Sequence, residues 1–186
     1  MIIDIVKSNF KIIIFGFVFT FFSSIGQSFF IGLFNSNIRA ELNITHGEFG
    51  TIYGVATLCS SLTLIWLGKK IDELKLVNYS ILVTLFLFIA ALFFSFVNGL
   101  IFLLVGIFFL RLSGQGLMAH TASTAVSRYF ERRRGKALSY IWLGMSLGEF
   151  LLPILIVYLL SFIYWRDLWM QTSIVILLIL PLFSFY

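Results

Sequence analysis

An arginine stands inside a long apolar stretch of the chain, in the run FFLRLSGQGLMAH at residues 108–120, and Glu149 stands inside another. Each charge is about 11 or 12 residues from one end of its stretch, which is near mid-depth for a spanning helix at 1.5 Å per residue. A charged group there costs about 2.5–3.5 kcal/mol on insertion scales, so it faces a protein interior or a wet cavity. Arg111 and Glu149 are therefore a neutralising ion pair, or a site that binds a solute or exchanges a proton. The two readings are compatible, because a ligand can compete for one partner.

Helical spacing divides the polar residues around Arg111 into two faces. Arg111, Gln115, Met118 and Ala122 share one face, and we expect it to line a cavity. Gln27, in the first apolar stretch, is a further candidate contact for a solute. The other side is typical of close helix packing in membranes. His120 there is either a proton carrier or a hydrogen-bonded packing residue. This second stripe consists of Ser113, Gly116, His120, Thr124 and Ser127.

The composition predicts the helices that position these residues. Of 186 residues, 60% are hydrophobic and 11% are charged, whereas soluble domains average about 25% charged residues. A spanning helix needs roughly 20 consecutive apolar residues, and the chain has six such stretches. We therefore predict an all-α, polytopic membrane protein, with residues 1–186 forming a single six-helix bundle. The predicted spans are 12–34, 49–67, 76–97, 100–127, 137–163 and 168–186.

Local signals predict how these helices begin, pack and bend. The segment at about 35–50 is predicted as a polar loop, and TxxE at 45–48 within it has the spacing of a capping box. In the fifth span, Gly144 and Gly148 form a GxxxG pattern that lets backbones approach closely. Pro153 removes one helical hydrogen bond and permits a kink.

The distribution of positive charge predicts the orientation. Ten of the 13 lysines and arginines lie in the N-terminal segment and in the loops at about 68–75 and 128–136. By the positive-inside rule these segments and the N-terminus are cytoplasmic, in the cell (inner) membrane. Trp165 and Trp169 fall where an aromatic belt would lie on the other side. The net charge of +5 is then a topogenic signal, and a nucleic-acid partner is not expected.

The order of these motifs resembles the N-terminal half of a major facilitator superfamily transporter. LGKKIDELK at 67–75 is similar to the family's GxxxD signature, although Glu73 replaces the usual arginine. RYFERRRGKAL at 128–138 resembles the FxxRRGxA stretch of monocarboxylate-like and oxalate–formate-like branches. GMSLGEFLLP at 144–153 stands where the family has its fifth-helix motif, and YWRDLW at 164–169 stands where many members have a WR turn.

The resemblance implies two inverted 3+3 repeats and alternating access. Arg111 corresponds to the family's fourth-helix arginine, followed by packing glycines at Gly114 and Gly116. The family usually has twelve helices, so the resemblance implies a fragment or truncated product that lacks a C-terminal half, with a homodimer of six-helix units as the alternative. The gating residues that it implies are Gly68, Asp72, Arg128 and Arg134.

The function that follows is secondary active transport of a small solute, with proton or ion coupling. A guanidinium in low dielectric is a good carboxylate partner, so an organic anion at Arg111 is expected. Glu149 or His120 would carry the coupling proton. A non-transporting membrane scaffold or subunit is the alternative. An intramembrane enzyme is not expected, because Ser113 and His120 are separated by about 10 Å along one helix. No cofactor or metal motif occurs in the sequence.

Overall fold

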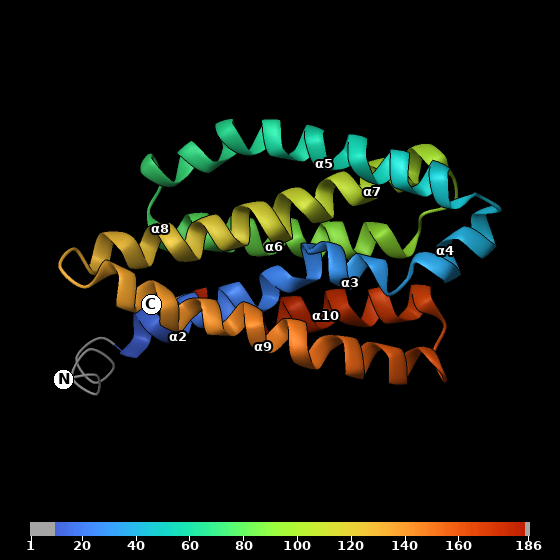
Figure 1. The fold of residues 1–186 in the computed structure, drawn as a ribbon. Coiled ribbons are helices and arrows are strands. Elements are labelled where there is room, and N and C mark those ends of the chain that lie inside the picture. Colours follow the sequence, from blue (N-terminus) through green and yellow to red (C-terminus); the bar gives the residue numbers. More distant parts are fainter. Residues whose placement is uncertain (1–9, 185–186) are drawn as a thin grey trace.

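The computed structural model describes residues 10–184, in which six helices are long and apolar enough to span a membrane. They confirm the six predicted spans (Figure 1). No strand occurs within residues 10–184. Lys7, which belongs to the predicted N-terminal positive charge, lies outside the described residues. So do residues 185–186, the predicted end of the sixth span. The spans are Phe10–Gly32, His46–Asp72, Leu76–Ser95, Leu100–Tyr129, Arg134–Leu160 and Trp165–Ser184.

Two of the spans are interrupted, whereas we predicted continuous α-helices. The first consists of α2 (Phe10–Ser23), a 3-10 turn (Ser24–Gly26) and α3 (Ser28–Gly32). The fourth consists of α7 (Leu100–Leu110), a π-helical segment (Arg111–Met118) and α8 (Ala119–Tyr129). The remaining spans consist mainly of α5 (His46–Lys69), α6 (Leu76–Ser95), α9 (Arg134–Leu160) and α10 (Trp165–Ser184).

The connection between the first two spans is partly helical, so its prediction as a loop is wrong. Helix α4 (Asn35–Leu42) ends at Asn43, whose φ of 54° is left-handed. Asparagine tolerates that conformation and commonly ends helices in this way. The capping box predicted at 45–48 is confirmed. The Thr45 hydroxyl accepts from the Glu48 backbone N–H at 3.2 Å, and the Glu48 carboxylate accepts from the Thr45 N–H at 2.8 Å.

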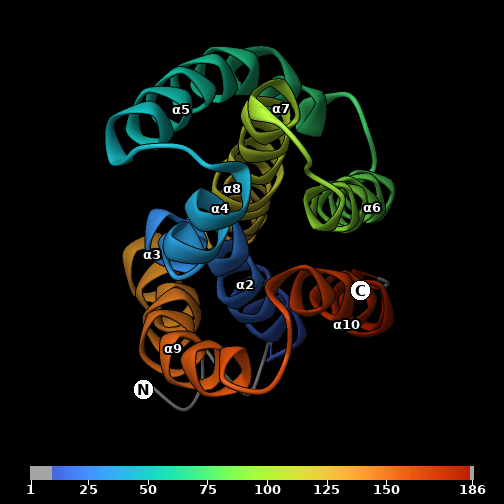
Figure 2. The same ribbon diagram turned by 90° about the vertical axis from the view of Figure 1, so that its right-hand side faces the viewer.

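The six spans pack in two corresponding sets of three. Helix α2 packs along α9, the fourth span packs along α5, and α6 packs along α10. If spans one, two and three are exchanged with spans four, five and six, the pair of first and fifth becomes the pair of fourth and second, and the pair of third and sixth is unchanged. This is the pattern of an inverted repeat. Viewed along the bundle, the first and fourth spans lie between α5 and α9 (Figure 2). The two interrupted spans are therefore the central ones.

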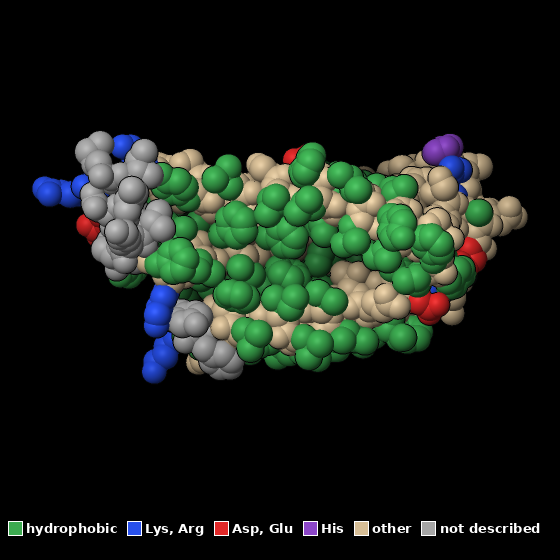
Figure 3. Space-filling model, turned by 90° about the horizontal axis from the view of Figure 1, so that it is seen from below, with side chains coloured by type: hydrophobic (Ala, Val, Ile, Leu, Met, Phe, Trp, Pro, Cys, Tyr) green, Lys and Arg blue, Asp and Glu red, His purple; other side chains and the backbone are tan. Residues whose placement is uncertain are grey.

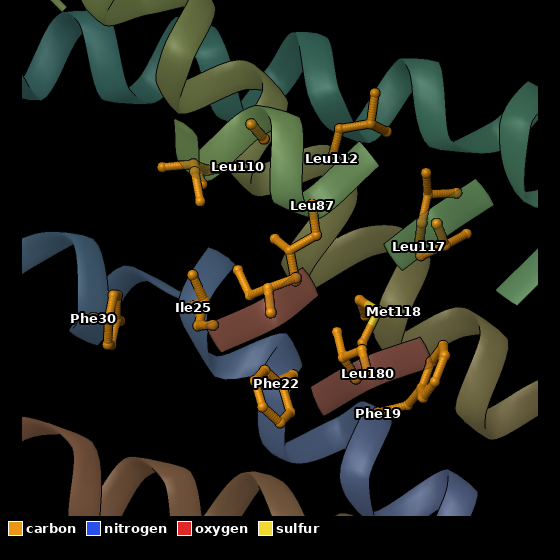
Figure 4. Close-up of a cluster of buried hydrophobic side chains, with 14 of the residues drawn as sticks. Phe19, Phe22, Ile25, Phe30, Leu87, Leu110, Leu112, Leu117, Met118 and Leu180 are labelled. Atoms are coloured by element: carbon orange, nitrogen blue, oxygen red, sulfur yellow. The ribbon is translucent and has the colours of Figure 1, made fainter. Parts of the chain in front are cut away.

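The core of the bundle is filled by large side chains from several spans. Phe19, Leu87, Leu110, Met118 and Leu180 are fully buried where α2, α6, the fourth span and α10 meet (Figure 4). Because lipid is as apolar as these side chains, close van der Waals contact rather than removal from water drives their packing. The π-helical segment also packs against the first span.

The two tryptophans at the start of α10 belong to the core and not to a lipid-facing belt. Trp169 is completely buried, and its ring centroid lies 4.7 Å from Phe94 and 5.0 Å from Phe34. Trp165 is 1% exposed and also packs on Phe94. The predicted aromatic belt at these positions is wrong. Aromatic pairs of this kind stabilise the packing of α6 and of the junction between α3 and α4 on α10.

Candidate functional site

The interrupted segments of the two central spans cross each other in backbone contact. A Cβ on Gly26 would lie 2.3 Å from the Leu110 carbonyl oxygen, and a Cβ on Gly114 would lie 2.7 Å from the Gly26 Cα. Only glycine permits so close an approach. Gln27 is extended (φ −82°, ψ 157°), which ends the 3-10 turn before α3 begins. A π-helical segment is frequently found at functional sites, so the crossing is the first candidate site.

Arg111 lies at this crossing and is only 7% exposed. Its Nη1 donates to the Gly26 carbonyl oxygen at 3.3 Å and to the Ser28 hydroxyl at 3.2 Å, both long for a charged donor. The guanidinium carbon is 5.4 Å from the centre of the Tyr53 ring. Among the described residues no carboxylate pairs with Arg111. A buried positive charge is therefore held by weak neutral contacts.

Three buried polar groups, on Arg111 and on the face of α5 that carries Tyr53, have unused hydrogen-bonding capacity. The Arg111 Nε, the Tyr53 hydroxyl and the Thr57 hydroxyl are buried without a hydrogen-bond partner among the described residues. Tyr53 and Thr57 are four residues apart on α5, so they share one face. We call Arg111, Tyr53 and Thr57 the Arg111 cluster. Buried polar groups normally have a partner, and three without one define a place for a polar ligand or water.

The expected ion pair between Arg111 and Glu149 is not formed. Glu149 is exposed on α9 and has no ion pair among the described residues. The first span packs against both α9 and the π-helical segment and so lies between the two charges. Similar depth on consecutive helices does not establish which way each side chain points.

Gln27 connects the crossing to the flank of α9 that carries Glu149. Its side chain is 8% exposed, and its Nε2 donates to the Met145 sulfur at 3.9 Å. Met145 precedes Glu149 by one helical turn. Gln27 therefore lies toward the flank of α9 that carries Glu149, and Ser28, the next residue in the chain, is exposed.

The predicted cavity face of the fourth span is only partly open. Gln115 is half-buried, but Met118 and Ala122 are completely buried in the core. A π-helix bonds residues five apart and so has more residues per turn than an α-helix. The helical phase of 100° per residue, which we assumed for the sequence, therefore misplaces residues beyond Arg111.

The small and polar stripe of the fourth span packs against α5. A Cβ on Gly116 would lie 3.2 Å from the Leu64 side chain, and the Nε2–H of His120 donates to the Gly68 carbonyl oxygen at 3.1 Å. The Ser113 hydroxyl donates to a carbonyl in its own helix at 2.6 Å. Ser113 and His120 are thus bonded to other groups, in the geometry of packing residues.

The arginine-rich end of the bundle carries an ion pair between Asp72 and Arg128. Arg128 also donates to the Ile71 carbonyl oxygen at 3.5 Å. Asp72, Arg128 and His120 line a pocket of about 360 Å³. The paired side chains are 61% and 54% exposed, so the pair stabilises the fold by about 0–1 kcal/mol. Arg134 is exposed at the start of α9 and forms no ion pair among the described residues.

The glycines of α9 lie against the first span. A Cβ on Gly144 would lie 2.2 Å from the Phe17 carbonyl oxygen, and one on Gly148 would lie 2.3 Å from the Ser24 hydroxyl. Pro153 is half-buried inside α9, which remains a single helix from Arg134 to Leu160. This contact holds α9 beside the crossing.

A second polar cluster, at the opposite end from the arginine-rich loop, was missed in the sequence. The Glu41 carboxylate accepts from Arg166 at 2.7 and 2.9 Å, from the Trp165 indole at 2.7 Å, and from the Tyr164 hydroxyl. Arg166 also donates to the Ser95 carbonyl oxygen at 3.0 Å. The sequence did contain one indication of this cluster, because the run YWR places three adjacent side-chain donors at the start of a helix. The cluster joins α4, α6 and α10.

The Glu41 cluster is expected to make stability depend on acidic pH. Burial opposes ionisation of Glu41, but hydrogen bonds from Arg166, Tyr164 and Trp165 and the positive charge of Arg166 hold its pKa below the ordinary 4.5. A lowered pKa in the folded state contributes stability above the unfolded pKa, and this is lost as pH falls through the folded pKa. We expect Glu41→Gln to cost about 1–2 kcal/mol at pH 7.

Thermal unfolding in detergent at pH 7 and below 4.5 checks this expectation. The difference between wild type and Glu41→Gln should shrink as pH falls below 4.5. Glu73→Gln is the matched control, because Glu73 is 60% exposed in a pair within one turn. An undiminished difference at the lowest pH would contradict the assignment of the lowered pKa to Glu41.

Comparison with known proteins gives one match. The family model described as Major Facilitator Superfamily matches residues 16–186. This range contains the crossing, the Arg111 cluster and both polar ends of the bundle. No curated protein and no solved structure matches the chain.

Proposed function

The chain belongs to the major facilitator superfamily, and on that premise we propose that it is part of a secondary active transporter whose Arg111 binds the anionic group of a small organic solute. Members of this family are membrane transporters, and the six apolar helices make the chain a multi-pass membrane protein. The observation that carries the proposal is the buried guanidinium of Arg111, which has no carboxylate partner among the described residues.

The Arg111 cluster supports an anion rather than a cation as the bound group. The Arg111 Nε–H is a donor only, and the Tyr53 and Thr57 hydroxyls can donate as well. All three are buried without a partner in the described chain. A carboxylate oxygen could accept from several of them, and charge-assisted bonds in low dielectric are about twice as strong as neutral ones. Gln27 and Gln115 would supply further polar contacts to the solute.

Glu149 is the better candidate for proton coupling in this proposal. The Nε2–H of His120 already donates to the Gly68 carbonyl oxygen. Glu149, in contrast, is exposed at mid-span and has no ion pair in residues 10–184. A carboxyl group at this depth is tolerated where water or protein covers it. Protonation would remove the charge of Glu149 when the water or protein around it changes during transport.

The exposed side that carries Ser28 and Glu149 is the proposed contact with a further six-helix unit. The unit would be a C-terminal half of the same polypeptide or a second copy, and the solute would bind between the two. The pair of Asp72 and Arg128, with Gly68 and Arg134 nearby in sequence, would gate the cytoplasmic side. In the proposed orientation the N-terminus is cytoplasmic, and the protein is expected in the cell (inner) membrane.

The anion proposal is tested with matched pairs of carboxylates and amides. The complete gene product is reconstituted in proteoliposomes, and small carboxylates and their uncharged amides compete with labelled carboxylate for uptake. We expect carboxylates to compete about 100-fold more tightly, since one strong charge-assisted contact contributes about 3 kcal/mol. Equal competition by the amides would refute an anion site at Arg111.

The coupling role of Glu149 predicts a separation of two activities. Glu149→Gln should abolish accumulation driven by a pH gradient and leave exchange of internal for external solute within about threefold of wild type. Glu131→Gln is the control, because Glu131 is exposed in the arginine-rich loop. Gradient-driven accumulation that survives Glu149→Gln would remove Glu149 from the coupling step.

A further inference from the structure

An apolar groove of about 360 Å³ lies between α9 and α10, and no residue of the Arg111 cluster lines it. Leu155 and Leu159 line it from α9, Val175 and Ile179 line it from α10, and Phe22 of the first span lines it as well. The surrounding surface is largely hydrophobic and is hollowed near its middle (Figure 3). Helices α9 and α10 make few direct contacts with each other. None of the groove's lining residues is charged.

The length of the groove matches one leaflet of a bilayer. Its lining on α10 extends from Leu168 to Ile179, a rise of about 16 Å at 1.5 Å per residue. The hydrocarbon core of a bilayer is about 30 Å thick, so one leaflet is about half of that. The groove begins near the Trp165 end of α10, so an acyl chain from that leaflet could lie along it over most of the leaflet's thickness.

The polar residues of the groove lie toward the same end. Thr172 lines the groove, but its hydroxyl already donates to the Leu168 carbonyl oxygen at 2.7 Å. Gln171 also lines it, is exposed, and has no hydrogen-bond partner among the described residues. An uncharged amide donor at the outer end of an apolar groove suits an ester carbonyl.

We propose that this groove binds one acyl chain of a phospholipid from the leaflet at the Trp165 end, with the ester carbonyl oxygen accepting a hydrogen bond from the Gln171 amide. The acyl chain fills the space between α9 and α10 and contacts both helices, which make few direct contacts with each other. A ligand that binds only the folded protein stabilises it by mass action. The lipid site is separate from the solute site and does not depend on what the solute is.

Lipid binding to the complete gene product in mild detergent tests the groove. Native mass spectrometry follows retention of added palmitoyl-oleoyl-phosphatidylethanolamine. Leu155→Trp fills the groove and should weaken retention at least tenfold. Leu178→Trp adds the same volume at a residue that is 65% exposed and does not line the groove, so retention should be unchanged. Val175→Trp repeats the test from the opposite wall if Leu155→Trp does not fold.

The hydrogen bond to Gln171 is tested with an ether-linked phospholipid of the same chains. Wild type should retain the diester lipid about fivefold better than the diether lipid, as expected for one neutral hydrogen bond. Gln171→Leu should remove this preference. Equal retention by the groove-filling variants and Leu178→Trp would overturn the site, and equal retention of the two lipids by wild type would overturn the Gln171 contact.

Discussion

Arg111→Gln is expected to lower solute uptake at least about 100-fold while the protein remains folded. The guanidinium is the buried positive charge of the Arg111 cluster and makes two neutral hydrogen bonds within residues 10–184, at 3.2 and 3.3 Å. Its removal therefore costs the fold little, and desolvation of an unpaired charge is relieved. Transport would lose the charge-assisted contact with the solute, about 3 kcal/mol. Initial uptake rates in proteoliposomes, with Tm in detergent measured in parallel, check both statements.

Two further variants separate charge from geometry. Arg111→Lys keeps the charge but loses the planar fork and the Nε donor, so we expect uptake between that of wild type and Arg111→Gln. Arg132→Gln is the control, because Arg132 is exposed in the loop before α9. A scaffold or subunit without transport activity predicts instead that Arg111→Leu combined with Glu149→Leu is harmless. Normal uptake by Arg111→Gln would contradict the proposed solute contact.

Gly26→Ala is expected to destabilise the protein by more than about 4 kcal/mol, enough to prevent recovery of folded material. The added Cβ would lie 2.3 Å from the Leu110 carbonyl oxygen, 2.5 Å from the Gln115 backbone nitrogen and 2.8 Å from the Gly114 Cα. All three are backbone atoms, so no side chain can rotate to make room. The two central spans would have to separate, which breaks the packing of the core. The fraction of monodisperse protein in size-exclusion chromatography measures the effect.

Gly32→Ala is the matched control for the crossing. Gly32 ends α3 in the same span, and a Cβ there meets nothing within 4 Å. The control variant should therefore behave like wild type, and Gly114→Ala, with a Cβ 2.7 Å from two backbone atoms of Gly26, should behave like Gly26→Ala. Normal yields of Gly26→Ala would show that the two spans are less closely packed than the structure has them.

The crossing connects these two predictions physically. The 3-10 turn of the first span ends in an extended Gln27, and the carbonyl oxygen of Gly26 is turned toward Arg111. Close backbone contact between Gly26 and Gly114 brings the start of α3, with Ser28, within reach of the guanidinium. The Gly26 variant therefore removes the platform for the solute contact, whereas the Arg111 variants change the contact on an intact platform.

Properties that depend on local composition could be predicted from the residues. A bilayer leaves no water for backbone groups, so any run of about 20 apolar residues must be helical, and all six spans were located. The capping box at Thr45 was predicted because its hydrogen bonds join residues three apart. Arg111 was singled out because a charge in an apolar run is costly wherever the neighbours lie. The depth of each of these groups follows from counting residues.

What could not be predicted depends on partners far apart in the chain. The break after Gly26 and the π-helical segment at Arg111 arise where two spans cross, and each glycine alone looks like any other. Rotation about a helix axis is set by packing, so equal depth did not place Glu149 beside Arg111. The donors to Glu41 are residues 164–166, which follow it by more than 120 positions in the chain. The bilayer forces each apolar segment into a helix, but only contacts between helices establish which side chains meet.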